Sequence, residues 1–219
     1  MSVVFLDLDG TLTDSGPGII NSVDFALKKM NLPPLTGDTS WLVGPPLWGS
    51  FEKLGVKKQD LDKAVAFYRE RYADIGWSEN SLYPGILDQL STLRRAGYTL
   101  CLATSKAHSY ARKITAHFGI SEYLSYEFGS ELDGTRSDKT SLLAHGLKTT
   151  GAEADHAIMV GDRHYDAVGA KANGIKVIGA EYGYGSEEEL AKAAVDTIIF
   201  SPSDLAEAVI RILPLRTMK

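Results

Sequence analysis

Short apolar runs recur along most of the chain, and a stretch with helical character separates each run from the next. The runs are Val3–Leu8, Thr99–Ala103, His156–Val160, Lys176–Gly179 and Thr197–Phe200. Helices are predicted between them, including residues 105–118, 139–147 and 165–172, each followed closely by a glycine. Alternation of this kind favours a parallel, doubly wound α/β sheet, because parallel strands need long crossovers that helices usually supply.

A long segment after the first run interrupts this alternation. Apolar residues recur there at three- and four-residue spacing, without a convincing buried strand, over residues 19–30, 46–54 and 59–74. Turn sequences bound the segment, Asp14-Ser-Gly-Pro17 at one end and Tyr83-Pro-Gly85 at the other. We therefore expect a helical cap of residues 14–83 inserted into an α/β core of residues 1–13 and 84–219. Two crossings would form a hinge for a moving lid, with a rigid second layer as the alternative.

Charge and composition narrow the range of partners. The chain carries 23 Lys and Arg against 28 Asp and Glu, a formal net charge of −5, and its basic residues are scattered. A nucleic acid polymer is therefore not an expected partner, and an anionic small molecule would need a local attraction such as a metal ion or a lysine.

The single cysteine, Cys101, excludes an intramolecular disulfide and suits a reducing compartment. The N-terminal apolar run is too short for a signal peptide or a membrane span, so we expect a cytoplasmic monomer or homodimer that binds no membrane.

Two aspartates directly follow the first strand, in the motif Asp7-Leu-Asp9-Gly-Thr11. Ligands of open α/β sheets bind beyond the carboxyl ends of the strands, so both carboxylates fall where catalysis is expected. They can act as a nucleophile and an acid/base partner if their environments separate their pKa values. An EF-hand loop begins similarly, but it needs glycine sixth and glutamate twelfth, whereas here glycine is fourth and Gly18 is twelfth. A plain acidic turn is the other alternative.

Further polar groups lie near the ends of later strands. Thr104-Ser105 is predicted to open a helix, where a hydroxyl and free amides bind an oxyanion, although helix capping is the commoner explanation. Lys139 could neutralise charge there, although a solvated lysine is the simpler explanation for this residue alone. The segment Gly161-Asp162-Arg-His-Tyr-Asp166 holds two carboxylates that can meet at one cation or, as often, cap a helix. Their joint placement at one sheet edge is more informative than any of them alone.

The four motifs together resemble those of the haloacid dehalogenase superfamily, in the same order along nearly the whole chain. They are Asp7-x-Asp9-Gly-Thr11, Thr104, Lys139 and Gly161-Asp162-x-x-x-Asp166. The insertion, between the first and second motifs, is similar in position to the helical cap of the phosphoglycolate-phosphatase-like branch. Short segments such as Gly44-Pro-Pro-Leu47 look most like bacterial phosphoglycolate phosphatases or 5′-nucleotidases.

This resemblance implies a phosphomonoester phosphatase acting on a small phosphometabolite, such as phosphoglycolate or a nucleoside 5′-monophosphate. Asp7 would be the nucleophile that forms an aspartyl-phosphate. Asp9 would protonate the leaving oxygen and then activate the water that hydrolyses the intermediate. Thr104, Ser105 and Lys139 would bind the phosphoryl group.

The resemblance also implies a Mg²⁺ site beside the nucleophile. Its ligands would be carboxylate oxygens of Asp7 and Asp162 together with the backbone carbonyl of Asp9. Asp166 would lie outside these ligands and orient both Lys139 and the metal's surroundings.

Substrate selection is expected to fall to the insertion, because the core motifs would contact mainly the phosphate. A loop with two prolines is stiff and can pre-organise a pocket wall. Tryptophans more often pack helices together, however, and a helix arginine is more often solvated. The candidates for substrate contact are Trp41, Gly44, Pro45, Trp48 and Arg69.

Other activities stay open at this point. Haloacid dehalogenases use the same nucleophile but lack the second acid, which Asp9 supplies here. A phosphonatase would need a Schiff-base lysine in the insertion, for which Lys53, Lys57 and Lys58 are candidates, and a sugar phosphomutase would need to exclude water. A non-catalytic phosphometabolite-binding module would keep the same fold. The segment Gly183-Tyr-Gly185-Ser186 lacks the rest of a dinucleotide fingerprint, so we interpret it as a loop.

Overall fold

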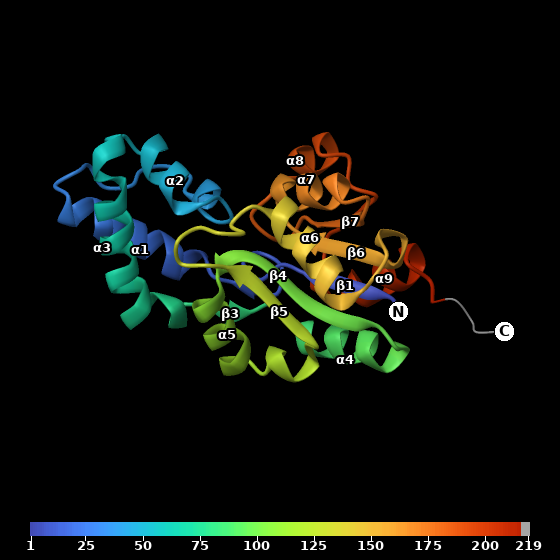
Figure 1. Cartoon of the computed structure of the whole chain (residues 1–219). Helices are drawn as coiled ribbons and strands as arrows, with labels where there is room; N and C mark the ends of the chain where they lie inside the picture. Colours follow the sequence, from blue (N-terminus) through green and yellow to red (C-terminus); the bar gives the residue numbers. More distant parts are fainter. Residues whose placement is uncertain (216–219) are drawn as a thin grey trace.

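The computed structural model describes residues 1–215, which form an α/β sheet with a helical insertion beside it (Figure 1). The strands of the main sheet are β1 Val3–Leu6, β4 Thr99–Ala107, β5 Tyr126–Ser130, β6 Ala157–Gly161, β7 Lys176–Ala180 and β8 Thr197–Ile199. All are parallel, and their spatial order is β5-β4-β1-β6-β7-β8. From the central strand β1, the chain adds β4 and β5 on one side of the sheet. It then returns to the other side of β1, where it adds β6, β7 and β8 in turn. This is the doubly wound arrangement that the alternating sequence pattern predicts.

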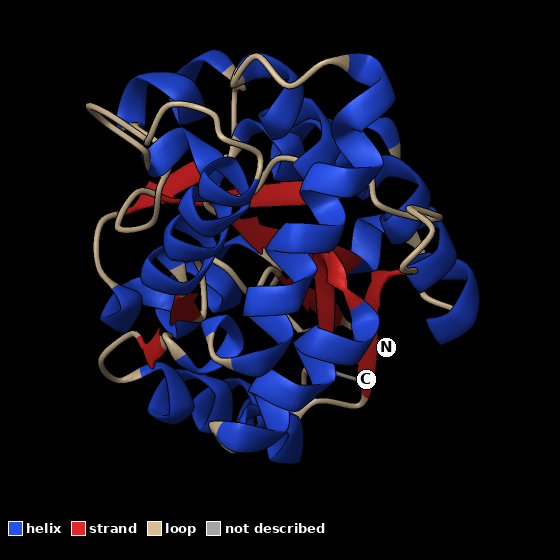
Figure 2. Cartoon of the chain, turned by 90° about the vertical axis from the view of Figure 1, so that its left-hand side faces the viewer, coloured by secondary structure: helices blue, strands red, loops and turns tan. Residues whose placement is uncertain are grey.

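Helices cover both faces of this sheet, and the strands lie between them in Figure 2. One face packs against α4 Ile86–Ala96, α5 His108–His117 and α9 Leu205–Ile212. The other packs against α6 Lys139–Thr150, α7 His164–Ala172 and α8 Glu187–Lys192. Because successive strand residues point to opposite faces, Val4 and Leu6 join the first core while Val3 and Phe5 join the second, and all four are fully buried. The site at the end of β1 thus rests on a fully buried strand.

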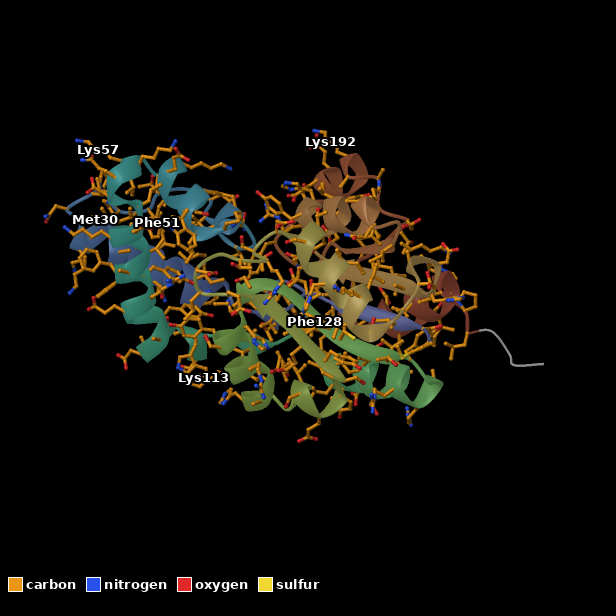
Figure 3. The ribbon with its side chains drawn as sticks, viewed as in Figure 1. Met30, Phe51, Lys57, Lys113, Phe128 and Lys192 are labelled. Atoms are coloured by element: carbon orange, nitrogen blue, oxygen red, sulfur yellow. The ribbon has the colours of Figure 1, made fainter. Side chains whose placement is uncertain are left out.

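The insertion has a hydrophobic core of its own. Its helices are α1 Gly16–Lys29, α2 Leu47–Lys53 and α3 Leu61–Asp74, packed around buried side chains that include Phe51 (Figure 3). Two short strands, β2 Thr13–Asp14 and β3 Ser81–Leu82, pair antiparallel where the chain enters and leaves the insertion. The two crossings are therefore hydrogen-bonded to each other. Short 3₁₀ segments lie at Ser40–Leu42, Lys58–Asp60, Gly76–Ser78, Ile120–Tyr123, Ala154–His156 and Pro202–Asp204.

Two details of the core differ from the sequence-based expectations. The edge strand β5 has no counterpart among the predicted apolar runs. In addition, β4 continues to Ala107, whose pairing with Ser130 of β5 keeps this segment extended, so α5 begins at His108 and not near Ser105. The prediction that Thr104-Ser105 opens a helix is therefore wrong.

The structure also bears on Cys101 and on the possibility of a membrane-spanning helix. Cys101 is fully buried, and this burial raises the pKa of its thiol to about 12, so it behaves as a small core residue. Within residues 1–215, none of the helices combines the length and apolar character that a bilayer crossing requires.

Candidate active site

Asp7 and Asp9 lie at the carboxyl end of the central strand β1. The backbone amide of Asp7 donates to the carbonyl of Val160 at 3.0 Å, which continues the β1–β6 pairing to Asp7. The chain then turns sharply at Gly10, whose φ is +81°. A Cβ at Gly10 would lie 2.1 Å from Oδ2 of Asp162, so the turn needs glycine both for its backbone conformation and for the approach of this carboxylate.

Lys139, the first residue of α6, points into the same place. Its Nζ lies 2.9 Å from Oδ1 of Asp7 and 2.6 Å from Oδ1 of Asp166, and it donates to the carbonyl of Ala103 at 2.8 Å. The α6 N-terminus is fixed by the Asp138 side chain, which accepts a hydrogen bond from the Ser141 amide. A lysine that alone would be expected in solvent is therefore only 5% exposed and paired with two carboxylates.

Three carboxylates converge beside this lysine. Asp7, Asp162 and Asp166 each offer an oxygen within 4.8 Å of the others, and all three residues are buried. Asp162 accepts hydrogen bonds from the Tyr184 amide at 2.8 Å and from the Thr11 hydroxyl at 3.4 Å. Oδ2 of Asp166 accepts from the backbone amide of Arg163 at 3.1 Å.

Burial first and neighbouring negative charge second raise the pKa values of two of these carboxyl groups. Burial raises the pKa of Asp7 to about 6, with Lys139 opposing and Asp166 adding to the shift. Burial likewise raises the pKa of Asp162 well above its usual range, and the charges of Asp166 and Asp7 add to it. For Lys139, burial favours the neutral form, but the two carboxylates outweigh it and raise its pKa, so it stays charged.

This donor set fits a hard divalent cation. Lys139 pairs with two of the three carboxylates, and two of the three carboxyl groups have raised pKa values, so additional positive charge would be stabilised here. Carboxylate oxygens are the ligands that Mg²⁺ and Ca²⁺ use in proteins. The acidic triad is therefore able to bind a metal ion.

Thr104 and Ser105 line the cavity in front of Asp7, although they lie on a strand and not at a helix start. The Thr104 hydroxyl accepts from the Lys106 amide at 3.3 Å, and the Ser105 carbonyl accepts from the Ser130 hydroxyl at 2.9 Å. An oxyanion site at these residues would therefore use hydroxyl groups and strand-end amides instead of helix-start amides.

The cavity lies between the core and the insertion and has a volume of about 100 Å³. Of the insertion residues predicted to contact substrate, Gly44, Pro45, Trp48 and Arg69 line it. Arg69 donates to the Leu132 carbonyl across the cavity mouth at 2.7 Å. Within the described part of the chain, Trp41 is not among the lining residues and packs against the hydrophobic core of the insertion.

Sequence reasoning missed Lys106, a core residue at the cavity. Its Nζ lies 2.8 Å from Oδ2 of Asp9 and 4.8 Å from the Tyr72 ring centroid. Burial favours neutral Lys106, but Asp9 and Tyr68 outweigh burial and raise its pKa. Its spacing from Thr104 is a signal that could have found it, because residues two apart on an extended strand point to the same side.

Aromatic side chains from the core and from the insertion line the cavity, and these too were not predicted. The rings of Tyr68 and Tyr72 stack at 5.3 Å, and Tyr110 of α5 meets Tyr72 edge-on at 5.2 Å. Helical periodicity assigns the first two to the core of the insertion, which they also occupy. Their second role becomes visible only when the insertion is docked on the core.

A family model described as haloacid dehalogenase-like hydrolase matches residues 3–180. The chain belongs to the haloacid dehalogenase-like hydrolases. A 5′-nucleotidase of Pseudomonas aeruginosa is 42% identical over 189 residues, which are 85% of this chain and 86% of that protein. Phosphoglycolate phosphatase 1 of the same species is 30% identical over 212 residues, or 93% of this chain and 78% of that protein. The solved structure of Mycobacterium tuberculosis Protein Tyrosine Kinase A is 38% identical, with a TM-score of 0.83 over 95% of this chain and 97% of that one.

These comparisons confirm the family inferred from the four motifs, its phosphoglycolate-phosphatase and 5′-nucleotidase relatives, and the α/β fold class. This member of the family is a phosphatase-type hydrolase. The activities for which the relatives are named differ from one another, so the substrate must be argued from the cavity.

Proposed function

We propose that this hydrolase cleaves a phosphomonoester by transferring its phosphoryl group to Asp7. The observation that carries the proposal is the position of Asp7, whose Oδ1 is 2.9 Å from Lys139 Nζ at the inner end of the cavity. Attack by Asp7 on phosphorus would form the acyl-phosphate and break the bond to the leaving oxygen. Lys139 would keep the carboxylate ionised and offset charge on the phosphoryl oxygens.

Asp9 would carry the proton in both steps. Its Oδ2 is held by Lys106, whereas its Oδ1 is buried with no hydrogen-bond partner among residues 1–215. An unpartnered buried oxygen of a cavity-lining residue is free to hydrogen-bond with the leaving group. Asp9 would protonate the leaving oxygen first and then, as a carboxylate, take a proton from the water that attacks the aspartyl-phosphate.

The phosphoryl oxygens would be bound by Thr104, Ser105 and Lys139. Both hydroxyl residues line the cavity next to Asp7 and Asp9, which supports this assignment. Positioning and charge neutralisation supply most of the catalysis in phosphoryl transfer, so these few contacts would contribute a large part of the rate enhancement.

Mg²⁺ is the cofactor we propose. Asp7, Asp162 and the backbone carbonyl of Asp9 would hold it, with Asp166 behind them bound to Lys139. When bound, the ion would neutralise the negative charge of the phosphoryl oxygens. The support for this site is the oxygen donor set and its uncompensated charge.

We further propose that the leaving group is mostly uncharged, with nucleoside 5′-monophosphates as the preferred class over phosphoglycolate. Of the cations among the described lining residues, Lys106 is paired with the Asp9 carboxylate, and only Arg69, which donates to the neutral Leu132 carbonyl, could meet a second anionic group. The remaining wall is rich in aromatic rings, which suit a nucleobase or a sugar face. Because the enclosed volume is about 100 Å³, a nucleotide would require the insertion to move outward.

The alternative activities have less support. Among the described lining residues the insertion contributes no lysine, so the Schiff base that a phosphonatase needs at Lys53, Lys57 or Lys58 has no place at the cavity. Asp9 argues against haloacid dehalogenation, as the sequence suggests. Phosphomutase activity and non-catalytic binding are distinguished by measuring phosphate release.

The deciding experiment measures phosphate release, with and without Mg²⁺, from 2-phosphoglycolate and from a series of nucleoside 5′-monophosphates. We expect Mg²⁺-dependent turnover with a higher kcat/KM for one or more nucleotides, and no turnover by Asp7→Asn. Activity of Asp7→Asn near wild type would contradict the covalent mechanism. A higher kcat/KM for 2-phosphoglycolate would contradict the substrate class but leave the mechanism intact.

A further inference from the structure

The loop that contains Gly183 and Gly185 presses against the metal-binding aspartate. Between the two glycines, the Tyr184 amide donates to Oδ2 of Asp162 at 2.8 Å. A Cβ at Gly183 would lie 2.2 Å from the Gly10 carbonyl oxygen, and one at Gly185 would lie 1.8 Å from the Asp162 carbonyl oxygen. The glycines therefore permit a close approach of backbone to backbone, which gives this loop a role other than nucleotide binding.

The other end of Tyr184 reaches the point where the chain enters the insertion. Its hydroxyl oxygen accepts from the Gly16 amide at 2.6 Å, and its O–H donates to the carboxylate of Asp14. A side chain at Gly16 would collide with this hydroxyl, since its Cβ would lie 2.7 Å away. Burial and the bond to Asp14 raise the pKa of the Tyr184 phenol, so it remains a donor. Because Asp14 of β2 pairs with Ser81 of β3, the contact acts on both crossings.

A second contact runs from the next core residue to the cavity wall. Arg163 follows Asp162 directly, is 8% exposed, and donates from Nη1 to the carbonyl of Val43 at 2.5 Å. Its Nε donates to Oε1 of Glu189 at 3.0 Å, which fixes the plane of the guanidinium group. Val43 immediately precedes Gly44, the first lining residue of the two-proline loop.

Asp162 and Arg163 are thus linked to the insertion at two separate places. We propose that Tyr184 and Arg163 are positioning residues that hold the insertion closed over the cavity, and that Tyr184 couples the Asp162 carboxylate to the hinge. The proposal rests on the proposed function, because closure matters only if the leaving group contacts the insertion. Entry of a large leaving group would require both contacts to break, and closure around it would restore them.

The sharpest test removes one oxygen atom. Tyr184→Phe keeps the ring and the backbone amide that binds Asp162, and Tyr182→Phe is the matched control because the Tyr182 hydroxyl donates at 2.9 Å to Thr11 within the core. Hydrogen exchange is measured at residues 14–18 in Mg²⁺ with inorganic phosphate. We expect exchange at the Gly16 amide to become about threefold to tenfold faster in Tyr184→Phe, as loss of one hydrogen bond implies, and to be unchanged in the control.

Kinetics provides a second readout. We expect Tyr184→Phe to lower kcat/KM for a nucleoside monophosphate about tenfold, mainly through a higher KM. For acetyl phosphate, whose leaving group is small, the decrease in kcat/KM should be smaller by a factor of about three or more. Arg163→Lys should accelerate exchange over residues 42–48 and shift the same ratio, because a single ammonium cannot reproduce the guanidinium fork. Arg94→Lys is its control, since Arg94 donates to Ser125 within the core.

The possible outcomes separate this inference from the proposed function. The inference would be overturned if, in Tyr184→Phe, the exchange rate of the Gly16 amide and the kcat/KM values for the nucleoside monophosphate and for acetyl phosphate all stayed within twofold of wild type. If the wild-type protein releases phosphate from no substrate, the proposed function fails, and the exchange comparison alone still decides whether Tyr184 and Arg163 hold the insertion.

Discussion

Lys106 Nζ lies 2.8 Å from Oδ2 of Asp9, and this pair is buried where the core meets the insertion. The lysine side chain is 7% exposed and the aspartate side chain 10%, so neither charge is well solvated. Lys106 also lies over the ring of Tyr72, which belongs to the insertion. A core lysine therefore touches both the proposed acid/base residue and the wall that would select the substrate.

Lys106→Met is expected to lower kcat about tenfold to a hundredfold, part of what a general acid contributes, because Asp9 loses the group that orients it. KM should change by less than about threefold, since phosphate binding is assigned to other residues. Lys106→Arg should recover part of the loss. The matched control is Lys192→Met, whose lysine side chain is 76% exposed. A change confined to KM would instead identify Lys106 as a substrate-binding residue.

Asp7→Asn is expected to stabilise the metal-free protein at pH 7.5. The folded-state pKa of Asp7 is raised to about 6 from 3.8, so folding is favoured while this group keeps its proton and is progressively disfavoured as the pH rises from about 4 to about 6. Asparagine removes that penalty, on the order of 3 kcal/mol for a shift of about two pH units at 1.4 kcal/mol per unit, while Lys139 keeps Asp166 as its partner. Urea unfolding at pH 5 and pH 7.5 in EDTA measures the difference. Equal destabilisation of the variant at both pH values would show that Asp7 is not penalised by burial.

The residues of the candidate site could be located from the sequence where reactive side chains directly follow a buried strand. Asp7 and Asp9 end a fully buried apolar run, so both the strand and its position at the sheet edge were readable from adjacent residues. Asp162 and Asp166 follow another such run at a spacing that brings carboxylates together. Lys139 was identifiable only as part of this set, because nothing local distinguishes it from a solvated lysine.

What the sequence did not reveal depends on contacts between distant segments. Strand β5 lies at the sheet edge, its Tyr126 is 39% exposed, and it therefore shows no apolar run. Pairing of Ala103 with Phe128 and of Ala107 with Ser130 then keeps residues 104–107 extended, against the helix predicted to begin at Ser105. The Lys106–Asp9 pair joins positions 97 residues apart, and only docking of the insertion brings Arg69 to the Leu132 carbonyl.

Asp162→Asn is expected to remove most of the thermal stabilisation by Mg²⁺. For the wild type, free Mg²⁺ at about a hundred times its Kd adds about 2.7 kcal/mol, which corresponds to a rise of roughly 5–10 °C in Tm for a chain of this size. Without Mg²⁺ the variant should melt at or above the wild-type temperature, because burial already disfavours the Asp162 carboxylate. Asp155→Asn, at an exposed position, is the control. A full Mg²⁺ response in Asp162→Asn would exclude Asp162 from the ligand set.

Gly44→Ala is expected to disturb the cavity wall beyond the backbone strain that the substitution causes. Gly44 has a φ of +105°, and a Cβ there would lie 3.1 Å from Cγ of Arg163. Gly37 provides the control, because its φ is +73° and no described atom lies within 4 Å of its ideal Cβ. Gly37→Ala should cost about 1 kcal/mol of unfolding free energy from left-handed strain alone.

Gly44→Ala should cost about 1 kcal/mol more than Gly37→Ala, because the new methyl group also overpacks the wall. Since the displaced arginine holds the Val43 carbonyl, the variant should also raise KM for a nucleoside monophosphate about fivefold, as a misplaced wall weakens binding of the leaving group. Urea unfolding and initial-rate kinetics measure the two effects separately. Equal unfolding costs for the two variants, together with an unchanged KM, would mean that Arg163 yields without moving the loop and that its contact does not set the position of the wall.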